Sequence, residues 1–216
     1  MNVFKALRIP DLFSLLNAFF GFLAILTAGT APFYVPVTFV FLSAAADGLD
    51  GLLARRLGSG VLGANLDSLA DLVSFGIAPA IISLGTFGRS WPAVLVALAY
   101  LTCGILRLAR FNVSKNSGYF EGVPITAAGV AAASSVLADR QLFTLSLMLV
   151  LAASMASSVP FPKIRDPRAM GAFAVILVTS TFLVMLQKDT GCALMLLAIT
   201  AYLSSPVVVP YLRRER

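Results

Sequence analysis

The 216-residue chain contains no histidine, and only 12% of its residues are charged. The lack of histidine excludes an imidazole acid or base, zinc sites with His ligands, and Ser-His or Cys-His catalytic pairs. Its two cysteines, Cys103 and Cys192, lie far apart inside apolar runs, where we interpret them as buried apolar side chains. Any chemistry must therefore use carboxylates, Arg, Lys and Ser.

What the chain does have is apolar sequence: 59% of its residues are hydrophobic and its mean hydropathy is +0.92. A soluble domain carries about 25% charged residues, twice the fraction found here. The composition predicts an all-α polytopic integral membrane bundle, organised as a single domain over 1–216. About 20 apolar residues are needed to cross the hydrocarbon core. Breaks at Gly, Pro and charged residues delimit eight such spans, at 12–29, 32–57, 63–87, 91–112, 122–138, 141–160, 169–187 and 190–211.

The basic residues support this count and predict the orientation. With the N-terminus in the cytoplasm, every Lys and Arg except Arg89, Arg140 and Lys188 falls on the cytoplasmic side. We therefore expect a cell-membrane protein with both termini in the cytoplasm. Residues 1–11 are read either as a positive flank or as an amphipathic helix at the interface. The net charge of +6 suits anionic lipid headgroups, and we expect the lipid bilayer, not nucleic acid, as the partner.

Four carboxylates stand out between residues 47 and 71. An ionised group inside a bilayer costs at least a few kcal/mol, so such a cluster needs a compensating partner. On helices, Asp47 and Asp50 are three residues apart, while Asp67 and Asp71 are four apart, so each pair projects from one face. A short turn between the helices would bring the pairs together on the cytoplasmic side. Hard divalent cations with oxygen ligands are the simplest way to keep the cluster charged.

The stretch reads D-x-x-D-G-x-x-A-R followed by G-x-x-x-D-x-x-x-D. It closely resembles the defining motif of the CDP-alcohol phosphotransferases, with one departure: seven residues, not the usual eight, separate Arg55 from Gly63. The segment L-D-S-L-A-D-L-V-S-F-G-I-A-P-A at 66–80 is similar to the phosphatidylserine synthase branch, which includes archaetidylserine synthases. R-L-A-R-F-N at 107–112 and G-V-P-I-T-A-A at 122–128 extend this similarity.

The resemblance implies an enzyme of phospholipid biosynthesis, with CDP-diacylglycerol or CDP-archaeol as donor and L-serine as acceptor. The serine hydroxyl would take the phosphatidyl or archaetidyl group, and CMP would be released. By the same resemblance, two divalent cations, Mg²⁺ or Mn²⁺, are held by the four aspartates, Asp71 also acts as the general base, and the protein is a homodimer. The four metal-binding positions are Asp47, Asp50, Asp67 and Asp71.

Two further sets of residues are candidates for substrate contacts. The CDP-lipid set contains small, polar and basic residues: Asn17, Gly51, Ala54, Arg55, Gly63 and Ser68. For Asn17 and Ser68 the alternative is a contact to groups that support the metal ligands. The serine set is charged: Arg107, Arg110, Lys115 and Glu121. Each set has a plainer explanation, because small residues also permit close helix packing and basic residues also fix membrane topology.

Two other functions compete with this interpretation. A sister enzyme would use glycerol phosphate or an inositol phosphate as acceptor, and would want more basic residues around the site. A divalent-cation transporter would place polar residues on several helices at midplane depth. Here the intramembrane acids are confined to two helices and lie near one end, which disfavours a transport pathway.

Overall fold

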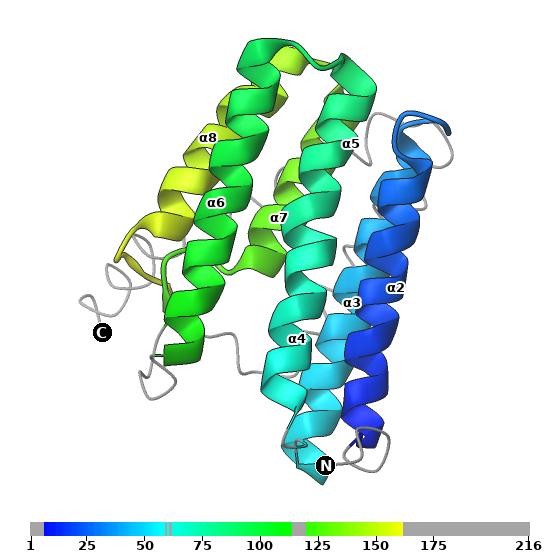
Figure 1. The fold of residues 1–216 in the computed structure, drawn as a ribbon, viewed down its shortest axis with the longest axis vertical. Coiled ribbons are helices and arrows are strands. Elements are labelled where there is room, and N and C mark those ends of the chain that lie inside the picture. The colour runs from blue at the N-terminus through cyan, green and yellow to red at the C-terminus, as the bar shows by residue number, and fades with distance from the viewer. Residues whose placement is uncertain (1–6, 59, 61, 114–119, 162–216) are drawn as a thin grey trace, which may run out of the picture.

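The computed structural model describes residues 7–58, 60, 62–113 and 120–161. Over these residues the chain forms a bundle of helices and one pair of two-residue strands (Figure 1). The predicted fold class, an all-α membrane helix bundle, is confirmed. The count of eight spans remains a prediction, because 169–187 and 190–211 lie outside the described residues.

The bundle begins with an antiparallel hairpin of α2 (Ile9–Thr27) and α3 (Tyr34–Leu57). Pro10 occupies the first turn of α2, where its missing N–H costs nothing. The Asp11 carboxylate accepts a hydrogen bond from the backbone N–H of Arg8 at 2.8 Å. Because α2 begins at Ile9, residues 9–11 belong to the first span. Residues 1–6 lie outside the described residues, so the interfacial helix at 1–11 stays a prediction.

The third span, 63–87, is continuous but irregular. It consists of α4 (Gly63–Asp71), the π-helical turn η1 (Leu72–Ile77) and α5 (Ala78–Phe87). Pro79 explains the irregularity, because proline lacks an N–H and its ring clashes with the carbonyl four residues earlier, that of Phe75. The backbone widens locally, and the N–H of Ala78 donates to the carbonyl of Val73, five residues back.

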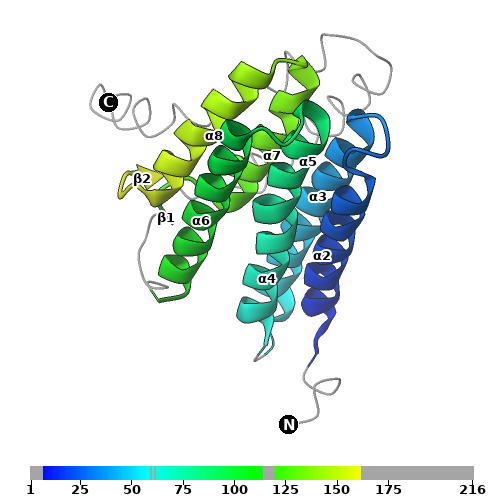
Figure 2. The same cartoon turned by 45° about the horizontal axis from the view of Figure 1, so that its top comes forward.

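The second half contains α6 (Trp91–Val113), α7 (Ile125–Ser135) with its 3₁₀ extension η2 (Val136–Ala138), and α8 (Gln141–Ala156). Nine of the eleven residues of α7 are buried, so α7 is surrounded by the other helices. The strands β1 (Phe120–Glu121) and β2 (Pro160–Phe161) pair antiparallel near the end of α8 (Figure 2). The span expected from residue 122 starts at 125, because Gly122 has a left-handed φ of 75° and Pro124 is extended.

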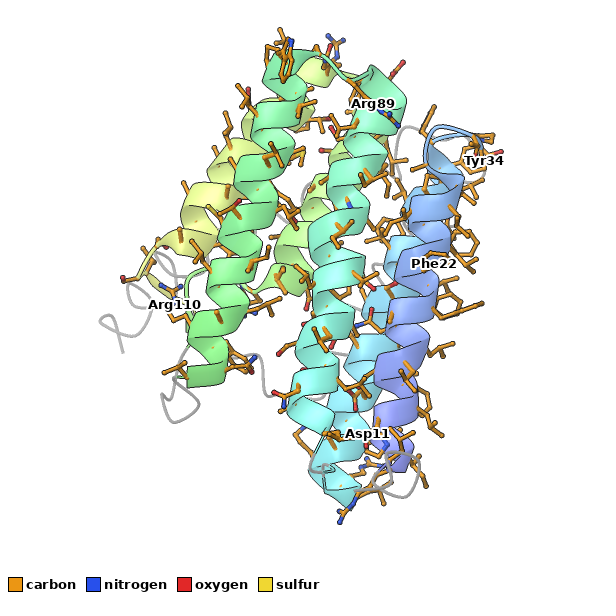
Figure 3. All side chains as sticks on the ribbon, in the orientation of Figure 1. Asp11, Phe22, Tyr34, Arg89 and Arg110 are labelled. Carbon is orange, nitrogen blue, oxygen red and sulfur yellow. The ribbon has the colours of Figure 1, made fainter. Side chains whose placement is uncertain are left out.

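In the part of the chain that the structure describes, four segments are long and apolar enough to cross a membrane: 9–27, 34–57, 63–87 and 91–113. Residues 125–138 and 141–156 form shorter apolar helices. Large apolar side chains of α2, including Phe19 and Phe22, are more than half exposed, and Figure 3 shows Phe22 on the outer side of the bundle. Such a surface is suited to lipid tails. Six of the eight predicted spans therefore correspond to helices in the described part of the chain.

Candidate metal site

The four acidic residues of the motif lie on the two helices on either side of residues 58–62. Asp47 and Asp50 are on the C-terminal half of α3, and Asp67 and Asp71 are on α4. Gly58 ends α3 with φ of 78°, a conformation that favours glycine and reverses the chain. The hairpin thereby brings two helix faces of like charge together.

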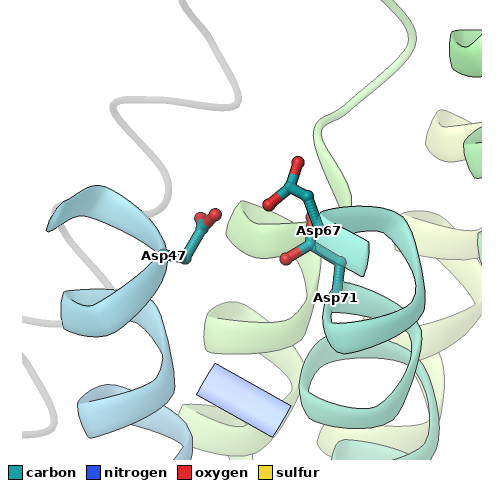
Figure 4. Close-up of side chains that lie close together, drawn as sticks. All are labelled: Asp47, Asp67 and Asp71. Atoms are coloured by element: carbon teal, nitrogen blue, oxygen red, sulfur yellow. The ribbon is translucent and has the colours of Figure 1, made fainter. Parts of the chain in front are cut away.

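Three of the four carboxylates converge. Asp47, Asp67 and Asp71 each offer an oxygen, and these oxygens all lie within 4.8 Å of one another (Figure 4). Asp71 is buried, while the other two are half-buried. Three carboxylates this close and this poorly hydrated repel one another unless a cation joins them. The donor set therefore fits a hard divalent cation such as Mg²⁺ or Mn²⁺.

The fourth aspartate lies apart from this group. Asp50 is 7% exposed, and its carboxylate accepts a hydrogen bond of 2.5 Å from the hydroxyl of Ser14 on α2. The predicted convergence of all four aspartates is thus met by three in this structure. The role of Asp50 as a metal ligand stays a prediction.

Two polar side chains hold the converging carboxylates. Asn17 on α2 donates from Nδ2 to Oδ1 of Asp71 at 3.1 Å, and Asn17 is fully buried. Thr126 on α7 donates from its hydroxyl to Oδ2 of Asp47 at 3.2 Å. Of the two contacts expected for Asn17, to the nucleotide or to groups that support the metal ligands, this structure contains the second, because Asn17 contacts an aspartate.

A cavity of about 250 Å³ opens beside the three carboxylates. It lies between α3, α4, α6 and the start of α7, and its walls combine acids, two arginines and apolar groups. The lining residues are Asp47, Gly48, Gly51, Arg55, Asp67, Ser68, Asp71, Arg107, Leu108, Phe111, Pro124 and Thr126. The carboxylates on its walls can hold a cation that binds an anionic ligand, and the arginines can pair with further acidic groups of the same ligand.

The two arginines predicted to bind serine have different surroundings. Arg107 lines the cavity, is 7% exposed, and its guanidinium carbon lies 5.5 Å from the ring centroid of Phe111. Arg110 instead donates from Nη2 to the carbonyls of Met155 and Ser157, each at 3.0 Å. It therefore caps the C-terminal end of α8, where cations are favoured. Arg110 is not among the residues that line the cavity.

The other predicted contacts divide in the same way. Gly51, Arg55 and Ser68 line the cavity, whereas Ala54 and Gly63 do not. Ser68 also exchanges hydrogen bonds with the amide of Asn112 on α6, at 3.1 and 3.3 Å. Lys115 and the side chain of Glu121 lie outside the described residues.

Several lining residues were not assigned a role from the sequence: Gly48, Leu108, Phe111, Pro124 and Thr126. Phe111 had a usable signal, because it stands four residues after Arg107 and so shares its helix face. Thr126 lies within the G-V-P-I-T-A-A segment, but nothing in that segment indicated that its hydroxyl reaches Asp47.

Comparison with known proteins gives consistent matches. The family model described as CDP-alcohol phosphatidyltransferase matches residues 7–164. An archaetidylserine synthase of Methanothermobacter thermautotrophicus is 36% identical over 165 residues, which cover 73% of this chain and 71% of the relative. CDP-diacylglycerol–serine O-phosphatidyltransferases of Methanocaldococcus jannaschii and Helicobacter pylori are 34% and 33% identical. Those matches cover 82% and 72% of this chain, and 84% and 72% of the relatives.

Proposed function

The chain belongs to the CDP-alcohol phosphatidyltransferase family, and we propose that it transfers the lipid phosphate group of a CDP-lipid to L-serine. The observation that carries the proposal is the convergence of Asp47, Asp67 and Asp71 on a cavity that also contains Arg55 and Arg107. The relatives named as serine phosphatidyltransferases or archaetidylserine synthase support serine as the acceptor.

In the proposed reaction the serine hydroxyl oxygen forms a bond to the phosphorus that carries the lipid. The bond from that phosphorus to the oxygen bridging the two phosphates breaks, and CMP leaves with this oxygen. The hydroxyl proton passes to the carboxylate of Asp71. Asn17 holds one oxygen of this carboxylate at 3.1 Å, which orients the group for proton transfer, where proximity matters most.

The aspartates are proposed to hold Mg²⁺ or Mn²⁺, with Asp50 completing the set because it follows Asp47 by one helical turn. A divalent cation bound there would supply Lewis-acid stabilisation of the diphosphate and of the leaving oxygen. Thr126 orients the Asp47 carboxylate through its 3.2 Å hydrogen bond. The arrangement resembles other metal sites in which a second layer of donors fixes the ligands.

The donor and acceptor are proposed to occupy different walls of the cavity. Gly51 leaves room for the nucleotide beside α3, and Arg55 neutralises the diphosphate. Arg107 binds the serine carboxylate from α6, since its planar guanidinium matches a carboxylate with two hydrogen bonds. The aromatic ring of Phe111 keeps the guanidinium in place.

The site is proposed to face the cytoplasm. Among the described basic residues, Arg8, Arg55, Arg56, Arg107 and Arg110 lie at the end of the bundle that contains the site, because they flank the start of α2 and the ends of α3 and α6. Arg89 and Arg140 flank helices at the opposite end, where Figure 3 labels Arg89. Excess positive charge marks the cytoplasmic side. The homodimer also stays a prediction, to be measured by light scattering in detergent.

The direct test supplies the purified protein with Mn²⁺ or Mg²⁺, radiolabelled serine, and either CDP-diacylglycerol or CDP-archaeol. We expect a labelled lipid and one CMP for each serine consumed, and no product after chelation with EDTA. Parallel reactions with labelled glycerol phosphate and inositol phosphate serve as acceptor controls. Turnover of one of these without turnover of serine would overturn the serine assignment and keep the family.

A further inference from the structure

The π-helical turn η1 follows directly after Asp71 and is built from the S-F-G-I-A-P segment of the sequence. In a regular helix the N–H of residue 79 would donate to the carbonyl of Phe75, but Pro79 has no N–H. The hydroxyl of Tyr100 on α6 supplies the missing donor and reaches this carbonyl at 2.8 Å. Tyr100 is fully buried, in a membrane interior where a lost backbone hydrogen bond has no water to replace it.

The turn is also held from two other helices. On the α2 side, Ser74 donates to the backbone carbonyl of Asn17 at 2.9 Å, and Gly21 leaves just enough room, since an added Cβ there would lie 2.7 Å from the Cα of Ser74. On the α7 side, a Cβ added at Gly129 would lie 2.6 Å from the Cα of Phe75. Three helices therefore determine the conformation of this irregular turn.

The turn is linked to the site by chain connectivity and by one shared residue. Asp71 is the last residue of α4 before the turn, and Asp67 lies one helical turn earlier. Asn17 binds both parts: its carbonyl accepts the hydrogen bond from Ser74, and its side chain donates to Asp71. A change in the π-turn rotates α4 relative to α5, and thereby moves both carboxylates relative to Asp47.

We propose that Tyr100 is a positioning residue for the transfer reaction: by donating to the Phe75 carbonyl that Pro79 leaves without an N–H, it maintains the π-turn that aims Asp67 and Asp71 at Asp47. Tyr100 does not line the cavity, so it acts through the backbone. This role rests on the proposed function only in taking the aspartates as the metal-binding and catalytic set.

The test compares Tyr100→Phe with Thr144→Val. Each change removes one buried hydroxyl that donates a hydrogen bond to a backbone carbonyl of another helix. In the control, Thr144 on α8 donates to the carbonyl of Ser135 on α7 at 3.1 Å, and neither residue lines the cavity. Binding of Mn²⁺ is measured by the loss of the free-ion electron paramagnetic resonance signal on adding detergent-solubilised protein. We expect the Mn²⁺ dissociation constant to rise about 10-fold in Tyr100→Phe, as for residues that support metal ligands, and to stay unchanged in Thr144→Val.

Pro79→Ala provides a second, independent variant if Tyr100→Phe fails to fold. Alanine restores the N–H, so the segment can revert to a regular α-helix with equal or greater thermal stability. On our proposal this variant still binds Mn²⁺ more weakly and turns over more slowly. Its kcat is expected to fall by a larger factor than its KM for serine rises. A purely structural role for the turn predicts unchanged Mn²⁺ affinity in both variants, and that result would overturn the proposal.

The two proposals fail separately. Wild-type protein that binds Mn²⁺ but leaves serine unreacted contradicts the proposed function, while the Mn²⁺ comparison among the variants still tests Tyr100. Equal Mn²⁺ affinity in wild type, Tyr100→Phe and Pro79→Ala removes the role of Tyr100, and the serine reaction stands.

Discussion

Asp71 is the buried member of the three converging carboxylates, and we propose it both as a metal ligand and as the general base. Substituting Asp71→Asn keeps the shape of the side chain and removes both its negative charge and its ability to accept a proton. We expect turnover, measured as CMP release, to fall by about 10²–10⁴-fold, the usual contribution of a positioned general base. The variant should remain monodisperse in detergent.

Asp139→Asn is a matched control for the loss of one carboxylate. Asp139 lies at the opposite end of the bundle in a left-handed conformation, with φ of 50°, which asparagine also tolerates. The turnover of Asp139→Asn should equal that of the wild type. If Asp71→Asn keeps a substantial fraction of wild-type turnover, Asp71 is not the base.

Arg107 and Arg110 stand one helical turn apart, yet their surroundings predict opposite phenotypes. Lysine retains the charge and loses the planar fork. Arg107→Lys should raise the KM for serine about 10-fold, the equivalent of one charged hydrogen bond, with little change in the KM for the CDP-lipid. Arg110→Lys should lower the melting temperature by roughly 2–4 °C through the weakened cap of α8, with the serine KM unchanged.

Steady-state kinetics with each substrate varied in turn, together with thermal melts in detergent, separate these outcomes. A raised serine KM in Arg110→Lys at an unchanged melting temperature would return Arg110 to the substrate site. The same measurements on Arg107→Lys show whether its contribution is to the acceptor or to the donor.

At this scale the sequence predicted the acids better than their partners. The spacings of Asp47 and Asp50, and of Asp67 and Asp71, place each pair on one helix face. A short turn between the two helices was then enough to predict that the two faces meet. Arg110 binds the end of α8 and Arg107 lines the cavity. The sequence could not distinguish them, because tertiary contacts set the position of the end of α8. The hydroxyl of Thr126 reaches Asp47 across 79 residues of chain, a separation that local pattern does not encode.

Among the described helices, α7 has the largest buried fraction, and its contact with the π-turn leaves no room for an added methyl group. A Cβ added at Gly129 would lie 2.5 Å from the Cβ and 2.6 Å from the Cα of Phe75. Gly129→Ala should therefore destabilise the protein by about 1–3 kcal/mol, as overpacked cores do. The readout is the melting temperature in detergent.

Gly48→Ala is the matched comparison, because it is also a glycine inside a helix and an added Cβ there meets nothing within 4 Å. Alanine favours helix by up to about 1 kcal/mol over glycine, so the melting temperature should stay equal or rise. Equal melting temperatures for the two alanine variants would contradict the close packing of α7 on the turn.

The helices themselves were largely predictable, because each is an apolar run bounded by Gly, Pro or charge. The departures have local causes. The segment 63–87 was predicted as one span with no internal irregularity, whereas it contains a π-turn whose Phe75 carbonyl accepts a hydrogen bond from Tyr100 on the next helix. Sequence pattern carries no information on such a long-range donor.

For the whole molecule, the unequal charge at the two ends predicts one orientation in the membrane. Gly60 lies in the turn at the site end and Ser90 lies in the turn between α5 and α6 at the other end. In a background with Cys103 and Cys192 replaced by alanine, Gly60→Cys and Ser90→Cys place single thiols at opposite ends. With the protein in a bacterial host, an impermeant maleimide added to intact cells should label Ser90→Cys and leave Gly60→Cys unlabelled.

Permeabilised cells are the control, since both thiols should react once the reagent reaches the cytoplasm. The orientation matters for the chemistry, because CMP and serine are polar and the cavity must exchange them with the compartment that holds them. An asymmetric charge distribution of five arginines against two among the described residues favours this arrangement through the membrane potential and anionic lipid. Labelling of Gly60→Cys in intact cells would place the site outside, and the positive-inside assignment would be wrong for this chain.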